Sequence, residues 1–310
     1  MRILITGGAG FIGSKLARRI IADGGQVVIV DNLSTGVRDN IPAEAEFIEA
    51  DVGRPETIGR LPLTPFDAVC HLAAQSSGAV SMEQPFYDFQ TNATSTLLLT
   101  RWCLKNGTRR FVYASSMAVY GNPATLPVGE LDSLNPISYY GVSKLASERL
   151  MAVAAAQGLR CTALRMFNVY GPGQNMANLR QGMASIYLAY LLRGEEVPVT
   201  GSLERFRDFV FIDDVIDAWM RVLSLESTPA PVYNIASGEA TRVQDLLGYL
   251  ISACGLPPDH PVRRLPAPPG DQFGLRADVS QALEDLGWRP GIGLAEGLRR
   301  FVSWARASGG

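Results

Sequence analysis

Cysteine and histidine are scarce in this sequence, which excludes two kinds of site. The 310 residues include four cysteines and two histidines. The cysteines lie far apart without any Cys-x-x-Cys spacing, and the histidines offer no paired ligand set, so we expect neither a metal site nor a disulfide framework. The residues concerned are Cys70, Cys103, Cys161, Cys254, His71 and His260.

Long apolar runs and a concentrated basic face are also missing. No stretch reaches the roughly 18 apolar residues of a membrane span, and the N-terminal apolar run stops at Thr6, so we expect neither membrane insertion nor export. The net charge is −2, and the arginine pairs are scattered among acids, which argues against nucleic-acid binding. We therefore expect a globular protein of the cytoplasm.

A glycine-rich turn follows the apolar run 2–6 and precedes a helical pattern. A side chain at such a turn would keep the backbone from a diphosphate, and the amides of a helix N-terminus favour negative charge. Gly8, Gly10 and Gly13 fit the general dinucleotide spacing, while Gly7, Gly10 and Gly13 fit a wider one. Glycine turns also serve plain strand-to-helix packing, so the turn alone leaves that alternative open.

A carboxylate ends the next apolar run, which covers residues 26–31. Asp31 lies eighteen residues after Gly13 (31 − 13). In a dinucleotide fold such a carboxylate accepts hydrogen bonds from the adenosine ribose hydroxyls, and it would repel a 2′-phosphate. The sequence therefore favours NAD over NADP as the cofactor.

Short β-rich runs alternate with longer helical segments up to about residue 168. This alternation predicts an α/β fold with a doubly wound parallel sheet, that is, a Rossmann domain over residues 1–168. Residues 169–310 are predicted to form a smaller C-terminal α/β substrate lobe, and about 207–236 to rejoin the first domain. The predicted strands are 2–6, 26–31, 46–50, 67–71, 110–115 and 161–167.

Further elements are expected in the C-terminal part of the chain. Asp213 or Asp214 is predicted to cap a helix that follows a strand. The stretch 257–269 holds six prolines and cannot form a regular helix. The other predicted helices are 182–192, 279–286 and 294–307.

Tyr140 and Lys144 form a Tyr-x-x-x-Lys pair that begins 24 residues after Ser116 (140 − 116). A spacing of four places both side chains on one face of a helix. A free tyrosine has a pKa of about 10, so it acts as a base at neutral pH only where positive charge stabilises the phenolate. Such pairs also occur by chance on helix surfaces, but the position after the fifth strand favours catalysis.

The helical segment between Glu83 and Asn106 is apolar over more than one stripe. The extra apolar surface could cover the sheet on one side and a partner subunit on the other. Together with the helix containing residues 140–153, it predicts a homodimer with a four-helix contact. The apolar residues are Leu97, Leu98, Leu99, Trp102 and Leu104.

Taken together, the motifs resemble the extended short-chain dehydrogenase/reductase family. Within it, the chain is most similar to the NAD-dependent nucleotide-sugar epimerase/dehydratase group, and to its UDP-hexose 4-epimerases in particular. The match covers nearly the whole chain, in the correct order. The matching elements are the Gly7 turn, Asp31-Asn32, Asp51-Val52, His71-Leu72-Ala73-Ala74, Asn92, Ser115-Ser116, Tyr140 with Lys144, Phe167-Asn168, Arg207-Asp208 and Pro269-Gly270-Asp271.

The resemblance implies a role for each matching residue. Tyr140 would be the catalytic base, Lys144 its electrostatic support and a ribose ligand, and Ser116 a partner of the reacting sugar oxygen. The substrate-binding residues would be Ser116, Asn168, Arg207 and Asp271. Asn168 and Arg207 would hold the nucleotide diphosphate, where an arginine fork suits phosphate geometry. NAD would contact Gly7, Gly10, Phe11, Ile12, Gly13, Asp31, Asn32, Ser34, Thr35, Gly36, Asp51, Val52, Leu72, Ala73, Ala74, Gln75, Asn92, Tyr140, Lys144 and Phe167.

One departure from the family pattern concerns the substrate phosphates. Pro268 stands where the epimerases usually carry an arginine. Either a phosphate contact is missing, or Arg263, Arg264 or Arg276 replaces it. Leu275 falls at the position of the residue that sets the size of the sugar pocket in the epimerases. A medium-sized apolar side chain there does not indicate which sugar binds.

The resemblance implies epimerisation of a nucleotide-diphosphate sugar at carbon 4 through a transient 4-keto sugar. The expected substrate is a UDP-hexose. A 4,6-dehydratase would need an acid and a base that its branch of the family places as Asp-Glu after the serine or threonine, where this chain has Met117-Ala118. A reductase of the same family remains a further alternative. A non-catalytic NAD-binding regulator is the alternative from another class, because fold alone does not establish activity.

Overall fold

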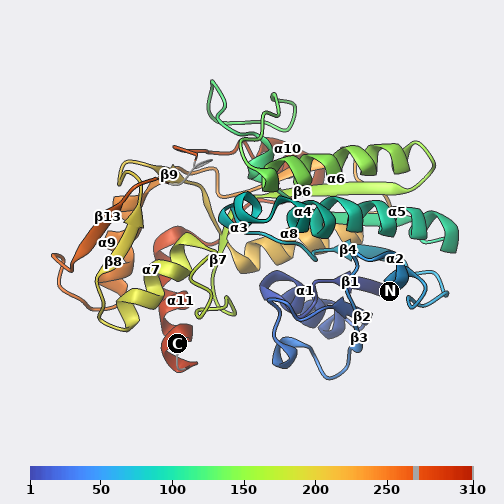
Figure 1. Ribbon diagram of the computed structural model, residues 1–310, viewed down its shortest axis with the longest axis horizontal. Helices are drawn as coiled ribbons and strands as arrows, with labels where there is room; N and C mark the ends of the chain where they lie inside the picture. Colours follow the sequence, from blue (N-terminus) through green and yellow to red (C-terminus); the bar gives the residue numbers. More distant parts are fainter. Residues whose placement is uncertain (268–271, 309–310) are drawn as a thin grey trace.

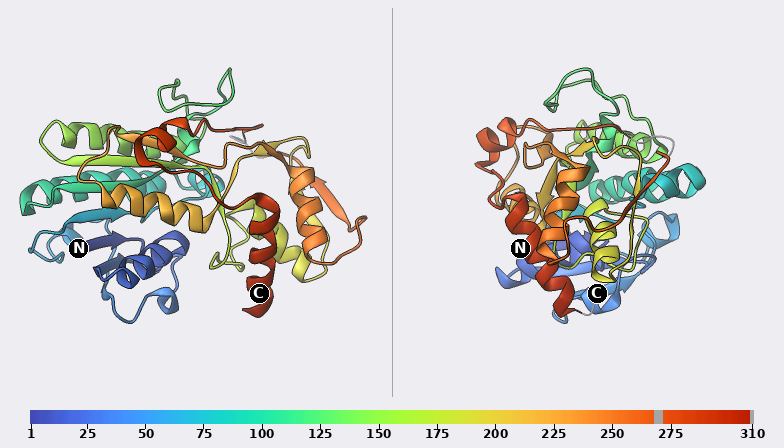
Figure 2. Two further views of the ribbon diagram at one scale, coloured as in Figure 1. Left: turned by 180° about the vertical axis from the view of Figure 1, so that it is seen from behind. Right: turned by 90° about the vertical axis from the view of Figure 1, so that its left-hand side faces the viewer.

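The computed structural model describes residues 1–267 and 272–308. The chain forms a larger lobe around a central sheet and a smaller lobe that contains α7, α9, β8 and β13 (Figure 1). Seen from behind, the two lobes again lie side by side (Figure 2, left). Within the described part of the chain, no helix combines the length and the apolar character that a membrane crossing requires.

Seven parallel strands form the central sheet, in the order β11-β6-β5-β4-β1-β2-β3. This order confirms the predicted α/β fold with a doubly wound parallel sheet. The six predicted strands agree with the observed ones to within one residue at each end, whereas the seventh strand, β11, was not predicted as a strand. The bounds are β1 Arg2–Thr6, β2 Gln26–Asp31, β3 Glu46–Glu49, β4 Ala68–His71, β5 Arg110–Ser116, β6 Arg160–Met166 and β11 Val232–Ile235.

Apolar side chains alternate between the two faces of the sheet, as strand geometry requires. Ile3 and Ile5 of β1 belong to the core that packs on α1 (Phe11–Ala22) and α8 (Ile212–Ser224). Leu4 points to the opposite core, with α5 (Ser95–Asn106) and α6 (Tyr139–Ala155). Helices therefore cover both faces, and the strands carry apolar residues on both sides, as buried parallel strands do.

The predicted helical segment 83–106 is interrupted in the structure. A short helix, α3 (Gly78–Glu83), ends before Pro85, and α4 (Pro85–Phe89) starts there because proline suits the first turn of a helix. A π-helical turn, η2 (Gln90–Thr94), then joins α4 to α5. The remaining short helices of the larger lobe are η1 Arg38–Asn40, α2 Pro55–Ile58 and η3 Met117–Val119.

Short strand pairs extend the structure beyond the central sheet. Strand β7 pairs in parallel with β10, which runs directly into α8. The predicted cap on this helix was wrong, because Phe211 is the N-cap residue and Asp213 and Asp214 lie in the first turn. The bounds are β7 Asn168–Tyr170, α7 Met183–Leu192, β8 Val197–Thr200, β9 Phe206–Arg207, β10 Phe209–Phe211, β12 Thr241–Arg242, α9 Val243–Ala253, β13 Val262–Leu265, α10 Ser280–Leu286 and α11 Leu294–Ala307.

Candidate active site

A cavity of about 550 Å³ opens at the carboxyl ends of the central strands. The chain proceeds from β1 towards β3 on one side of the sheet and from β4 towards β6 on the other, so β1 and β4 flank the topological switch point. Ligands of doubly wound sheets bind at this point. The lining includes residues of both lobes, for example Gly7 of the larger lobe and Met183 of α7.

The glycine turn brings its backbone close to the cavity. Gly7 has φ +71°, and a Cβ on it would lie 2.6 Å from the amide nitrogen of Ala73. A Cβ on Gly13 would collide with the carbonyl of Gly7, so the start of α1 packs tightly on the turn. The N-cap residue of α1, Gly10, offers no side-chain cap to the first amides of the helix. These features fit a diphosphate of a dinucleotide, which backbone amides bind without a side chain between them.

Asp31 occupies the end of β2 and lines the cavity. Its Oδ2 accepts a hydrogen bond from the amide of Ala9 at 3.0 Å, and its Oδ1 accepts one from the amide of Leu33 at 2.8 Å. A carboxylate has about four acceptor positions, so acceptor capacity is left for two ribose hydroxyls. The chemistry of this group fits the adenosine half of NAD.

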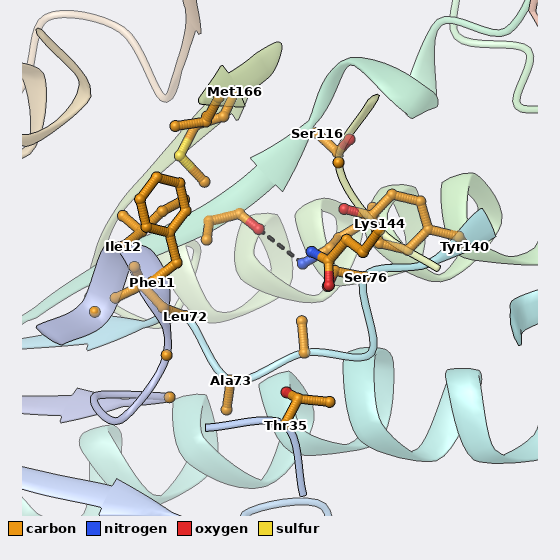
Figure 3. Close-up of a pocket in the computed structure, with 18 of the residues that line it drawn as sticks. Phe11, Ile12, Thr35, Leu72, Ala73, Ser76, Ser116, Tyr140, Lys144 and Met166 are labelled. Atoms are coloured by element: carbon orange, nitrogen blue, oxygen red, sulfur yellow. Dashed lines mark hydrogen bonds between the residues drawn. The ribbon is translucent and has the colours of Figure 1, made fainter. Parts of the chain in front are cut away.

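Three polar side chains meet on the other side of the cavity. Figure 3 shows Ser116, Tyr140 and Lys144 together, opposite Phe11 and Ile12. The Lys144 Nζ donates to the backbone oxygen of Ala114 at 2.8 Å, and it lies 5.7 Å from the centroid of the Tyr140 ring. The structure thus brings the three predicted catalytic residues into one wall.

Burial changes the proton affinities of this wall. It raises the pKa of Tyr140 to about 12, an effect that the Ser116 hydroxyl opposes and the Asp88 carboxylate increases. Burial lowers the pKa of Lys144 to about 7, while Asp88 and Glu148 oppose this change. Burial therefore disfavours the charged form of both groups, and Tyr140 remains a phenol unless further positive charge lies near it.

Most residues that the sequence assigned to NAD line the cavity. Gln75 and Asn92 do not line the cavity, because they bond to each other. The backbone amide of Gln75 donates to Asn92 Oδ1 at 3.0 Å. Those on the lining are Gly7, Gly10, Phe11, Ile12, Gly13, Asp31, Asn32, Ser34, Thr35, Gly36, Asp51, Val52, Leu72, Ala73, Ala74, Tyr140, Lys144 and Phe167.

Two of the predicted substrate residues line the end of the cavity nearest the smaller lobe. Arg207 donates to the backbone oxygen of Gln272 at 2.8 Å, and Asn168 donates from Nδ2 to the backbone oxygen of Asp208 at 3.0 Å. Asp271, like Pro268, lies outside the described residues.

The suggested replacements for the missing arginine do not reach this cavity. Among the described residues, the cations on the lining are Lys144 and Arg207, so Arg263, Arg264 and Arg276 are not part of it. Leu275 does not line the cavity either. It is fully buried in a separate apolar cluster with Tyr120 and Val128 of the larger lobe.

Sequence reasoning missed one whole wall of the cavity. The segment between β7 and α7 contributes amide side chains to the lining, and Ser76 and Ala79 contribute small ones. A signal was present, since the glycines at 171 and 173 flank a proline and amide residues follow at once. The amide residues are Gln174, Asn175, Asn178 and Gln181.

Carboxylates are few on the described part of the lining. Asp31 and Asp51 are the acids there: Asp31 is the last residue of β2, and Asp51 lies in the loop after β3. Next to Ser116, the lining carries Met117 and Ala118 instead. The wall around Tyr140 therefore offers no carboxylate within the described residues.

Comparisons with known proteins agree with this geometry. A model of the NAD dependent epimerase/dehydratase family matches residues 3–236. The UDP-glucose 4-epimerase of Mycolicibacterium smegmatis is 35% identical over 319 aligned positions, which cover 99% of each chain.

Two solved structures have the same fold over their full length. The UDP-glucose 4-epimerase of Thermotoga maritima, solved with UDP-glucose, is 36% identical with a TM-score of 0.95 over 100% of both chains. The enzyme of the same name from Thermus thermophilus, solved with NAD, is 34% identical with a TM-score of 0.91 over 99% of this chain and 100% of the other. This chain belongs to the NAD-dependent epimerase/dehydratase family.

Proposed function

We propose that this chain is an NAD-dependent 4-epimerase of a nucleotide-diphosphate sugar, with UDP-hexose as the substrate. The observation that carries the proposal is the convergence of Ser116, Tyr140 and Lys144 on one wall of a cavity that also contains the glycine turn. The similar proteins named above are UDP-glucose 4-epimerases, two of them solved with UDP-glucose or NAD.

We propose that the glycine turn holds the NAD diphosphate and Asp31 the adenosine ribose, since the backbone and acceptor geometry fit both. When bound, NAD supplies a hydride acceptor and the positive charge of its nicotinamide ring. The main chain near Ala73, together with Phe11 and Ile12, would form the apolar walls around it.

In the proposed reaction, Tyr140 accepts the proton of the sugar hydroxyl at carbon 4 while that carbon gives up its hydride, which leaves a ketone. Lys144 lies beside the Tyr140 ring and favours the phenolate. Ser116 orients the reacting oxygen from the end of β5. The ketone then presents its other face, the hydride returns, and Tyr140 gives the proton back, so the configuration is inverted.

Arg207 and Asn168 are proposed to hold the substrate diphosphate, with Asp271 as the further residue assigned by the resemblance. Hydrogen bonds from the Arg207 guanidinium to neighbouring carbonyls fix its orientation at the cavity wall. A fixed guanidinium loses little freedom when it binds phosphate. Residues 169–310 are proposed to act as the nucleotide-sugar lobe, and 1–168, rejoined by about 207–236, as the NAD domain.

The test uses UDP-glucose that carries deuterium at carbon 4. Epimerisation by internal return should give UDP-galactose that keeps its deuterium, with no net accumulation of NADH, as seen by mass spectrometry and absorbance. Loss of the label to solvent would indicate enolisation next to a ketone and would contradict the mechanism. A panel of UDP, dTDP, GDP and CDP sugars then identifies the base.

The alternatives make different predictions in the same assay. A 4,6-dehydratase would accumulate a 4-keto-6-deoxy sugar, but the position next to Ser116 holds Met117 and Ala118, neither of which is ionisable. A reductase would consume NADH in a stoichiometric amount. A non-catalytic regulator would bind NAD and leave every sugar unchanged.

Asp31→Ala should weaken NAD binding by about 10- to 100-fold, because charged hydrogen bonds to the ribose are lost. NADP binding should change much less, since the repulsion of the 2′-phosphate disappears as well. Calorimetric titration of both cofactors measures the two changes. Asp39→Ala, on the exposed turn η1, is the matched control and should alter neither affinity. Equal losses for NAD and NADP would show that Asp31 does not select between them.

We also propose a homodimer formed by α5 and α6. Leu97 and Val153 expose apolar side chains on these neighbouring helices, and Phe86 on α4 is 92% exposed. Light scattering at micromolar concentration should give twice the monomer mass. Val153→Glu should give monomers, whereas Leu283→Glu, on the exposed face of α10, should stay dimeric. A monomeric wild type would refute the homodimer.

We also propose a cytoplasmic location, in keeping with the four free cysteines.

A further inference from the structure

Asp88 on α4 is a fully buried carboxylate that the proposed reaction does not use. Its Oδ2 accepts a hydrogen bond from Ser143 Oγ at 2.6 Å. Its Oδ1 accepts from Gln75 Nε2 at 2.7 Å and from Asn92 Nδ2 at 3.2 Å. Amide nitrogens can only donate, so this oxygen acts as an acceptor, and the arrangement suits an ionised carboxylate.

This carboxylate joins two walls of the candidate active site. Ser143 lies between Tyr140 and Lys144 on α6, and α4 packs directly against α6. Gln75 sits in the loop whose neighbouring residues Ala74 and Ser76 line the cavity. The partner Asn92 lies on the π-helical turn η2, and such turns often occur at functional sites.

We propose that Asp88 is a positioning residue whose negative charge, held beneath Tyr140 and Lys144, sets the pH range in which this pair works. The inference rests on the proposed epimerase function, and it adds a role for a residue that touches neither the cofactor nor the sugar. A negative charge in a buried site favours the protonated form of each neighbouring group.

The pKa directions of Tyr140 and Lys144 agree with this placement. Burial raises the pKa of Asp88 itself, and the hydrogen bonds from Ser143, Gln75 and Asn92 and the charge of Lys144 oppose this change and favour the ionised form. Asp88 raises the pKa of Tyr140 and also that of Lys144, against the lowering that burial causes in the lysine. Without Asp88, Lys144 would lose more of its charge at neutral pH.

Other titratable groups face the pair from three elements. His71 of β4 is neutral, because burial lowers its pKa to about 3. Burial raises the pKa of Tyr113 of β5, so this phenol stays neutral as well. Glu148 of α6 forms a buried ion pair with Arg165 at 2.8 Å. Asp88, by contrast, accepts its hydrogen bonds from the neutral side chains of Gln75, Asn92 and Ser143.

Asp88→Asn tests the proposal in the pH dependence of kcat/KM. Removing the negative charge lowers the pKa of both groups, so both limbs of the profile should move to lower pH by about one unit. Relative to the maximum, activity at alkaline pH should fall and activity at acidic pH should rise. A lower rate with unmoved limbs would overturn the proposal, because it would indicate a merely structural role.

Two further variants separate charge from geometry. Ser143→Ala removes one hydrogen bond to Asp88 and keeps its charge, so its limbs should stay in place. The same acid shift in Ser143→Ala would also contradict the proposal. Asp88→Ser is a smaller neutral variant that should show the acid shift even if Asp88→Asn fails to fold.

A titration that needs no activity completes the test. The near-ultraviolet absorbance of the phenolate is followed in the NAD-bound protein, and the difference from Tyr140→Phe isolates Tyr140. In Asp88→Asn, this phenolate should form about one pH unit lower than in the wild type. An unchanged titration would refute the role of Asp88. An inert wild type with the expected shift would instead count only against the epimerase function.

Discussion

Replacing Tyr140 with phenylalanine is expected to lower kcat by about 10²- to 10⁴-fold, which is the usual contribution of general acid–base catalysis. The change removes one hydroxyl from a ring that faces the cavity, so packing and NAD binding should be preserved. Without the hydroxyl the wall loses the group proposed to take the sugar proton, and the carboxylates of the described lining, Asp31 and Asp51, lie away from Ser116 and Tyr140 at the ends of β2 and β3. Epimer formation measured by chromatography gives the rate.

The neighbouring Tyr139 provides a matched control for this prediction. It lies half exposed on the same helix turn and does not line the cavity. Tyr139→Phe should therefore leave kcat unchanged, while thermal unfolding and the released NAD should be the same for both variants. A Tyr140→Phe protein with more than a tenth of the wild-type rate would assign proton transfer to another group.

Replacing Arg165 with methionine is expected to give the largest loss of stability, about 3–5 kcal/mol. Arg165 on β6 holds both carboxylate oxygens of Glu148 on α6, at 2.9 and 2.8 Å, and the two side chains are only 3% and 6% exposed. Its removal leaves the buried Glu148 carboxylate without its ion pair, and the hydroxyl of Ser115 still donates to it. The thermal midpoint should fall by on the order of 10 °C.

An exposed ion pair of the same chemistry serves as the comparison. Arg180 contacts Glu83 at 2.6 Å with both side chains more than half exposed, and such pairs contribute about 0–1 kcal/mol. Arg180→Met should therefore shift the midpoint by only a few degrees. Similar losses of stability in the two variants would mean that burial is not the reason why the Arg165–Glu148 pair stabilises the protein. Calorimetry on both variants decides the question.

The sequence predicted those parts of the structure that depend on local patterns. The run 26–31 forms β2, and Gly7 forms the turn at the switch point, because strand alternation and a left-handed glycine depend on residues close in the chain. Strand β11 itself was not predicted, although about 207–236 was expected to rejoin the first domain. Its partner β6 lies about seventy residues earlier, and the pairing of Tyr233 with Leu164 has no local signal.

The sequence by itself determined the α/β class, the parallel strands and the glycine turn at the switch point, because each of these follows from spacing along the chain. Only the tertiary structure decided which polar residues reach the cavity. Gln75 and Asn92 turn away from it into the hydrogen-bond network of Asp88, whereas Gln174 reaches it from the smaller lobe. The physical reason is that a side chain's surroundings depend on how α4 packs on α6 and how the lobes meet, which local sequence patterns do not encode.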